Sequence, residues 1–135
     1  MNIQGKIWGT TSEIFNKNNV EVHRIEAKKG GYCSIHKHEH KYNMFFVESG
    51  SLSIEVWKND YDLVDITHLC QGQSTIVKPG EYHRFGANGD TVAFEIYWTE
   101  LSSDDIVRKN CGNLTAIPDD AIMYSEPHTK ETANA

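Results

Sequence analysis

Two histidines separated by a single residue, His36 and His38, constrain this chain more than any other feature. Alternate residues of a β-strand point to the same side, so both imidazole rings can face one point if the segment is extended. A third histidine, His83, follows the Pro79-Gly80 turn and can approach from a different strand. Three neutral imidazoles that converge on one point suit a divalent transition metal ion such as Zn, Mn, Ni, Co or Fe. The pattern therefore predicts a metal site inside a β-structure.

Turn residues recur at short intervals along most of the chain, as they do in all-β sandwiches and barrels. Between the turns lie short segments that either alternate apolar with polar residues or are apolar and aromatic, and these are predicted to be strands. The predicted strands are 20–26, 32–38, 43–48, 52–57, 61–69, 72–79, 83–85 and 91–98. Ser102 to Arg108 is different, because acidic residues follow a capping serine, and this segment predicts a short helix.

Length and composition predict one globular domain with a tail. A chain of 135 residues that is 39% hydrophobic can bury a core as a single domain. We place the β-domain at residues 1–112. Residues 113–135 are expected to form an arm, either packed on the domain or partly disordered towards residues 129–135.

Charge and cysteine content narrow the expected partners and location. The net charge of −6, with scattered Lys and Arg, argues against nucleic acid as a partner. No segment resembles a membrane-spanning helix, and the N-terminus lacks the apolar run of a secretory signal. The three cysteines, Cys33, Cys70 and Cys111, show no paired spacing, which favours reduced thiols in a cytoplasmic protein.

The spacing of glycines around the histidines resembles that of the cupin superfamily. The first cupin motif is matched by Gly30, His36, His38 and Gly50, and the second by Gly72, Gly80 and His83. Lys78 stands where the second motif usually has a proline. The match covers roughly residues 20–100 and implies a double-stranded β-helix, the jelly-roll barrel. It is specific for the fold and weak for the reaction, because one fold hosts many chemistries.

Asn43 stands where the first cupin motif has a glutamate, which leaves the fourth metal ligand open. Regular alternation from His38 would turn Asn43 to the opposite face, so a bulge or turn must intervene for it to reach the metal. As a neutral ligand, its amide would leave the metal site with one more net positive charge than a glutamate would. That charge favours anionic or polarised oxygen ligands from a substrate. Two alternatives stay open: Asn43 only hydrogen-bonds the backbone, or His40, which has the right parity, is the ligand.

The last predicted strand offers candidate catalytic residues. Glu95 and Tyr97 share one face, opposite Phe94, Ile96 and Trp98. A small barrel usually turns polar residues outward, whereas the resemblance to cupins implies a polar cavity beside the metal. If Glu95 faces that cavity, it is the acidic group placed to act as a general base.

The resemblance implies a small-molecule ligand and leaves three classes of function open. Segments 37–41, 45–52 and 78–85 are similar to the cupin domains of type II mannose-6-phosphate isomerases, which implies a metal-dependent isomerase of a sugar or sugar phosphate. A three-histidine site without a carboxylate also suits an iron-dependent dioxygenase. The third class is a cupin that binds a small molecule without catalysis, so the sequence leaves open whether the protein is an enzyme. Cupins commonly pack sheet on sheet, and a homodimer is therefore expected.

Overall fold

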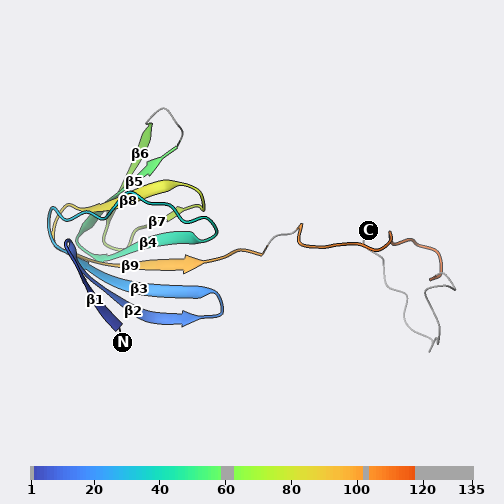
Figure 1. Ribbon diagram of the computed structural model, residues 1–135. Helices are drawn as coiled ribbons and strands as arrows, with labels where there is room; N and C mark the ends of the chain where they lie inside the picture. Colours follow the sequence, from blue (N-terminus) through green and yellow to red (C-terminus); the bar gives the residue numbers. More distant parts are fainter. Residues whose placement is uncertain (1, 59–62, 102–103, 118–135) are drawn as a thin grey trace. The chain divides into compact units, whose positions relative to one another are not determined.

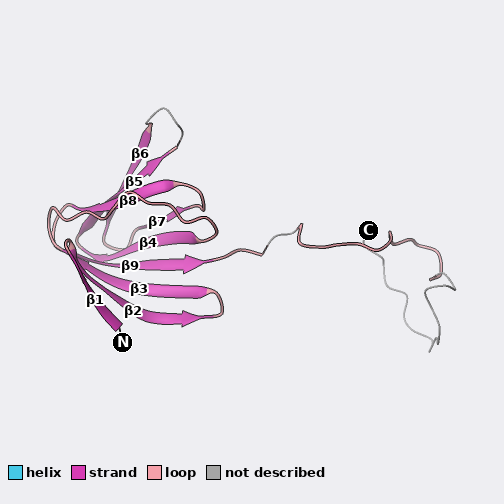
Figure 2. Ribbon diagram, viewed as in Figure 1, coloured by secondary structure: helices cyan, strands magenta, loops and turns pink. Residues whose placement is uncertain are grey.

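The computed structural model describes residues 2–58, 63–101 and 104–117, and the regular elements within these residues are all β-strands (Figures 1 and 2). In chain order they are β1 (Asn2–Lys6), β2 (Gly9–Lys17), β3 (Val20–Ala27), β4 (Tyr42–Ser49), β5 (Ser51–Trp57), β6 (Val64–Cys70), β7 (Ser74–Val77), β8 (Tyr82–Ala87) and β9 (Thr91–Trp98). The all-β class predicted from the turn spacing is confirmed. None of the described residues belongs to a helix that could cross a membrane.

The strands form two antiparallel sheets. The larger sheet has the order β1-β2-β3-β9-β4-β7, and the smaller has the order β6-β5-β8. Strands far apart in the sequence are therefore neighbours: β9 lies between β3 and β4, as Figure 1 shows. This arrangement is consistent with the jelly roll that the motif spacing implied.

The chain divides into two compact units, Met1–Glu100 and Leu101–Ala135, and the nine strands of the described residues belong to the first. The helix predicted over residues 102–108 is not formed at residues 104–108. The arm predicted for residues 113–135 stays a prediction. Residues 102 and 103 and residues 118–135 lie outside the described residues. The prediction for residues 129–135 therefore stays a prediction. The predicted domain boundary at residue 112 stays a prediction.

The segment predicted as a strand at 32–38 is not a regular strand. It is extended but makes only isolated antiparallel bridges, from Tyr32 to Gly86 and from His36 to His83 of β8. The predicted alternation therefore holds only locally, around the bridge at His36. This segment lies along the smaller sheet and brings the histidine pair to β8.

The interior changes from apolar to polar along the strands. Towards one end, Ile25 of β3, Val47 of β4 and Ala93 of β9 are fully buried. Towards the other end, the inward positions of β4 and β9 are Asn43 and Glu95, which are also buried. The apolar end supplies the stabilising core, and the polar end is free to carry chemistry.

Aromatic packing anchors the apolar part of the interior. Phe45 and Phe85, from opposite sheets, are among the largest fully buried side chains, and their ring centroids lie 6.1 Å apart. Trp8 packs edge-on against Phe85 at 4.9 Å. Because Phe45 also meets the ring of His83 at 6.2 Å, the core directly supports one of the candidate ligands.

Cys33 belongs to this core, whereas Cys70 and Cys111 are exposed, and all three thiols are free. The backbone N–H of Phe85 donates a hydrogen bond to the Cys33 sulfur over 3.2 Å. Burial raises the pKa of the Cys33 thiol to about 11, because the interior disfavours the thiolate.

The raised pKa predicts that Cys33 resists alkylation in the folded protein. At pH 8 only about one thousandth of this thiol is ionised, and the thiolate becomes abundant only as the pH approaches 11. Iodoacetamide treatment followed by peptide mass spectrometry should label the exposed Cys70 and Cys111 quickly and Cys33 at least about a hundredfold more slowly. In urea all three should react alike. Equal labelling of Cys33 and Cys70 in the folded protein would contradict the prediction.

Candidate metal centre

A backbone pairing between His36 and His83 creates the centre of the candidate site. The His36 N–H donates to the His83 carbonyl over 3.1 Å, and the His83 N–H donates to the His36 carbonyl over 2.9 Å. Residues paired in this way project their side chains to the same side of the sheet. The two ring centroids consequently lie 4.6 Å apart, although 47 positions separate the residues in the chain.

His38 is held against this pair by the turn that precedes β8. The N–H of Gly80 donates to the His38 carbonyl over 2.7 Å. Gly80 adopts a φ of +82°, a left-handed conformation that glycine accepts without steric cost. The ring of His38 lies 5.1 Å from that of His36 and 5.5 Å from that of His83.

The three imidazoles offer donor nitrogens that lie within 4.8 Å of one another. His36 Nδ1 lies 2.8 Å from the Ser34 carbonyl, and His83 Nδ1 lies 2.9 Å from the Glu81 carbonyl. A carbonyl can only accept, so both Nδ1 atoms carry the proton and both Nε2 atoms carry a lone pair. Such backbone contacts are the usual means of fixing the tautomer of a metal-binding histidine.

Two buried polar atoms in this cluster lack a hydrogen-bond partner among the described residues: His38 Nε2 and Asn43 Oδ1. Leaving buried polar atoms unpaired costs free energy, so a partner from outside the protein is expected. Burial, followed by the neighbouring His36 and His83, lowers the pKa of His38 to about 4. Burial also lowers the pKa of His83. The neutral rings that result are the form that binds a divalent metal ion, and the donor set fits one.

Asn43 reaches this cluster because the chain bends at residues 39 and 40 before β4 begins. Its side chain is 1% exposed, and its amide nitrogen lies 3.4 Å from His83 Nε2. The interruption resets the strand alternation, as the sequence required if Asn43 was to turn inward. His40 is exposed and lies outside the group of converging nitrogens.

Glu95 and Tyr97 lie on the inward face of β9, and Glu95 is buried. The Tyr97 hydroxyl donates a hydrogen bond to the Glu95 carboxylate, and the Tyr97 ring lies 5.3 Å from the ring of His38. Burial raises the pKa of Glu95, while the hydrogen bond from Tyr97 and the charges of His23, His36 and Lys41 act in the opposite direction. Burial, reinforced by Glu95, also raises the pKa of Tyr97. A buried carboxyl group therefore stands beside the histidine cluster, and its catalytic role stays a prediction.

Three further polar residues surround this carboxyl group and were not singled out from the sequence. His23 of β3 pairs with Glu95, and Glu21 pairs with Tyr97. His23 Nε2 and a Glu21 carboxylate oxygen lie 3.2 Å apart, and Lys41 lies over the Tyr97 ring. The alternation of residues 20–26 contained the signal for Glu21 and His23. It identified a strand with two unlike faces, but it did not tell that the polar face turns inward at this end.

Comparisons with known proteins agree with this architecture. Residues 23–100 match the family described as the cupin domain. A mannose-1-phosphate guanylyltransferase from Sinorhizobium fredii is 27% identical over 116 residues, which cover 83% of this chain and 21% of the relative. The chain therefore spans about a fifth of that curated relative.

Solved structures share the fold at low sequence identity. KdgF from Halomonas sp. has a TM-score of 0.63 and 13% identity, with 75% of this chain and 90% of KdgF covered. CapF from Staphylococcus aureus, a capsular polysaccharide assembling protein, has a TM-score of 0.63 and 19% identity, with 77% of this chain and 30% of CapF covered. At these identities the likeness concerns the fold alone.

The contact between Tyr97 and Glu95 generates a stability prediction. Tyr97→Phe removes the hydroxyl and leaves the buried carboxyl group without this donor. We expect a loss of about 1–3 kcal/mol in the free energy of unfolding, measured by urea denaturation of chelator-treated protein at pH 7. Tyr82→Phe is the matched control, because Tyr82 is exposed and its change should stay below about 0.5 kcal/mol. Equal changes in the two variants would contradict the buried contact.

Proposed function

This chain belongs to the cupin domain family, and on that premise we propose that it binds a divalent transition metal ion. His36, His38 and His83 would hold the ion, with Asn43 beside them. The observation that carries this proposal is the convergence of three donor nitrogens around a buried His38 Nε2 that has no partner among the described residues. A half-turn of the Asn43 side-chain amide exchanges its nitrogen and oxygen, so this residue can offer a neutral fourth ligand.

We further propose that the protein is an isomerase-like enzyme of a sugar or sugar phosphate. When bound, the metal ion would polarise the carbonyl and hydroxyl oxygens of an open-chain sugar. The relative named for mannose 1-phosphate supports a carbohydrate ligand. The buried carboxyl group of Glu95, close to the histidines, supports a reaction that moves a proton.

In this proposal Glu95 carries the proton between adjacent carbons of the substrate. Its raised pKa lets the carboxyl group hold a proton more readily than an exposed glutamate does, which suits a shuttle that must both take and return one. Tyr97 is a positioning residue, because its hydroxyl bonds Glu95 and fixes the direction of the carboxylate. Phe45, the cross-strand neighbour of Glu95, contributes an apolar wall that limits water at the carboxyl group.

The proposal also includes a homodimer in the cytoplasm. Ile3 on β1 and Ile14 and Phe15 on β2 are exposed apolar side chains that a second copy can cover. β1 is an edge strand of the larger sheet and leaves one side unpaired. Three free cysteines support a reducing compartment.

Elemental analysis of protein purified without a chelator or a histidine tag tests the metal site. We expect near-stoichiometric metal in the native protein. His83→Ala should weaken metal affinity by more than the ~10–100-fold that loss of an outer-shell partner costs. His36→Ala should do the same from a half-buried position, so a folding defect at the buried His83 cannot explain both results.

His68→Ala is the control for this experiment. His68 is exposed on β6, where its Nδ1 lies 2.8 Å from the Ser53 hydroxyl, and it is not one of the three histidines whose nitrogens converge. Metal loss in His68→Ala with retention in His83→Ala would overturn the site. A native protein that takes up no metal after reloading would overturn metal binding altogether. The favoured function would then be binding of a small molecule without a metal ion. Iron accompanied by oxygen uptake would favour the dioxygenase class.

Glu95→Gln tests the proton shuttle. Interconversion of aldose and ketose partners in D2O should place deuterium on the carbon beside the carbonyl, and NMR measures both exchange and turnover. We expect kcat to fall by about 10²–10⁴-fold in Glu95→Gln, with metal content unchanged. Glu48→Gln, at an exposed position on β4, should keep full activity. Full-rate isomerisation by Glu95→Gln would exclude Glu95 from the reaction.

A further inference from the structure

A cavity of about 230 Å³ opens beside the candidate metal centre. Its walls come from the β2–β3 hairpin, from the residue that precedes β4 and from the end of β9. The residues that matter here are Asn16, Asn19, Glu21, Lys41, Tyr97 and Trp98. Each of these side chains carries a polar group that can take part in binding an oxygen-rich ligand.

Tyr97 joins this cavity to the reaction site. The same side chain lines the cavity, packs its ring against His38 and donates its hydroxyl to Glu95. A molecule in the cavity is therefore one side chain away from the imidazoles and from the buried carboxyl group. The register agrees, because Asn16 pairs with Glu21, Glu21 with Tyr97, and Tyr97 with Asn43. This cross-strand row leads from the cavity to the candidate ligands.

Lys41 supplies a positive charge at the cavity and, among the described residues, forms no direct ion pair with a carboxylate, although its charge acts on the buried Glu95 without direct contact. Its Nζ lies 4.7 Å from the centroid of the Tyr97 ring, a cation–π contact, and the salt bridges of the described residues do not include it. Lys37 and Lys58, in contrast, each pair with a glutamate. A half-buried ammonium group without a carboxylate partner is suited to receive an anion.

The remaining cavity residues suit hydroxyl groups. The side chains of Asn16 and Asn19 have both donors and acceptors, and Glu21 has acceptor oxygens. Lys41 can receive one anionic group, while the two amides and the Glu21 carboxylate, which faces His23, can receive hydroxyls. A neutral apolar ligand would displace water from these groups without replacing its hydrogen bonds, which disfavours such a ligand.

We propose that this cavity binds the anionic group of a charged carbohydrate, with Lys41 as the partner of that group and Asn16, Asn19 and Glu21 facing the hydroxyls. This inference rests on the proposed function, because it makes the cavity the mouth of the same site and narrows the substrate to acidic or phosphorylated sugars. A phosphoryl group and a carboxylate share the required chemistry, and the experiment separates them.

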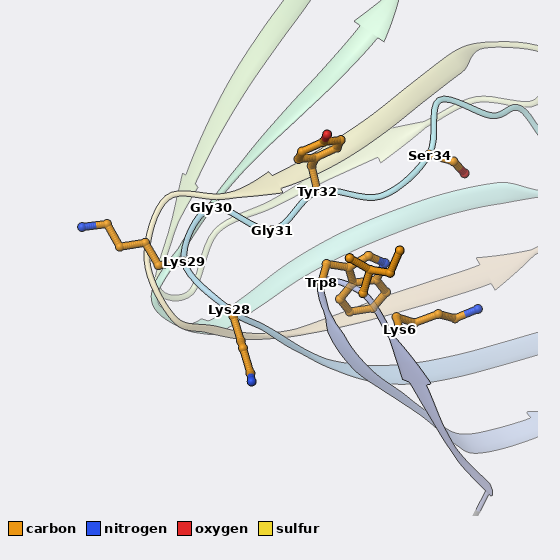
Figure 3. Close-up of a pocket in the computed structure, with 9 residues that line it drawn as sticks. Lys6, Trp8, Lys28, Lys29, Gly30, Gly31, Tyr32 and Ser34 are labelled. Carbon is orange, nitrogen blue, oxygen red and sulfur yellow. The ribbon is translucent and has the colours of Figure 1, made fainter.

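A second cavity, of about 580 Å³, provides the competing location for an anion. Lys6, Lys28 and Lys29 line it together with Trp8 and Tyr32. Figure 3 shows that the side chains of Lys28 and Lys29 extend away from Trp8 and Tyr32. This cavity is also separate from Tyr97, so it offers no route to Glu95. Lys6 on β1 therefore supplies a matched control that removes the same charge elsewhere.

The test measures Kd by isothermal titration calorimetry for glucose 6-phosphate, glucuronate and glucose. The full chain is used, loaded with whatever metal it retains. We expect both charged sugars to bind the native protein at least about tenfold more tightly than glucose, with the advantage reduced at high salt. Lys41→Met should remove that advantage, leaving the affinity for glucose and the metal content unchanged. Lys41→Arg should restore most of it, and Lys6→Met should behave as the native protein.

Each outcome decides the proposal. An effect of Lys41→Met on one charged sugar alone supports it and identifies the anion as phosphoryl or carboxylate. Equal affinity for charged and neutral sugars, or no binding of any of them, overturns it. If Lys6→Met loses the tighter binding of charged sugars and Lys41→Met keeps it, the proposal is overturned and the anion is assigned to the second cavity. If charged sugars depend on Lys41 but the protein holds no metal or Glu95→Gln is fully active, the binding site stands and the proposed reaction falls.

Discussion

The reciprocal backbone pairing of His36 with His83 is the contact on which the candidate site depends. Two hydrogen bonds between main chains bring imidazoles from distant parts of the sequence to 4.6 Å, without any requirement on the side chains themselves. The orientation of the two rings is then fixed by the hydrogen bonds that their Nδ1 atoms donate to the Ser34 and Glu81 carbonyls. Because the backbone carries the geometry, the donor nitrogens can be aimed inward before any ligand arrives, which lowers the entropic cost of binding one.

The polar end of the interior can exist because the apolar end stabilises the fold. Burying Asn43, His83 and Glu95 opposes folding wherever their polar atoms lack partners. The packing of Phe45 and Phe85 from opposite sheets offsets that cost, and Phe45 touches His83 as well. One aromatic side chain thus belongs both to the core and to the wall of the site. His83 is therefore packed directly against the apolar core of the barrel.

The sequence predicted the fold class and the positions of most strands, because the period-2 alternation and the turns are local signals. It also predicted which histidines converge, since the glycine frame carries that information. It could not decide the orientation of Glu95, because alternation identifies two faces without telling which one turns inward. It missed Lys41 and His23 for a related reason: their importance comes from Tyr97 and Glu95, neighbours that only the sheet register supplies.

The replacement of a carboxylate by Asn43 has an electrostatic consequence for the whole interior. Three neutral imidazoles and a neutral amide cancel none of the charge of a divalent ion. Glu95 lies nearby but is buried and bonded to Tyr97, and Glu21 already faces His23. Lys41 adds a further positive charge on the cavity side of Tyr97. A low-dielectric interior with this balance favours a ligand that brings its own negative charge, and it penalises a neutral one of the same shape. The departure from the family pattern at Asn43 and the positive charge of Lys41, two residues earlier in the chain, therefore favour the same property of the ligand.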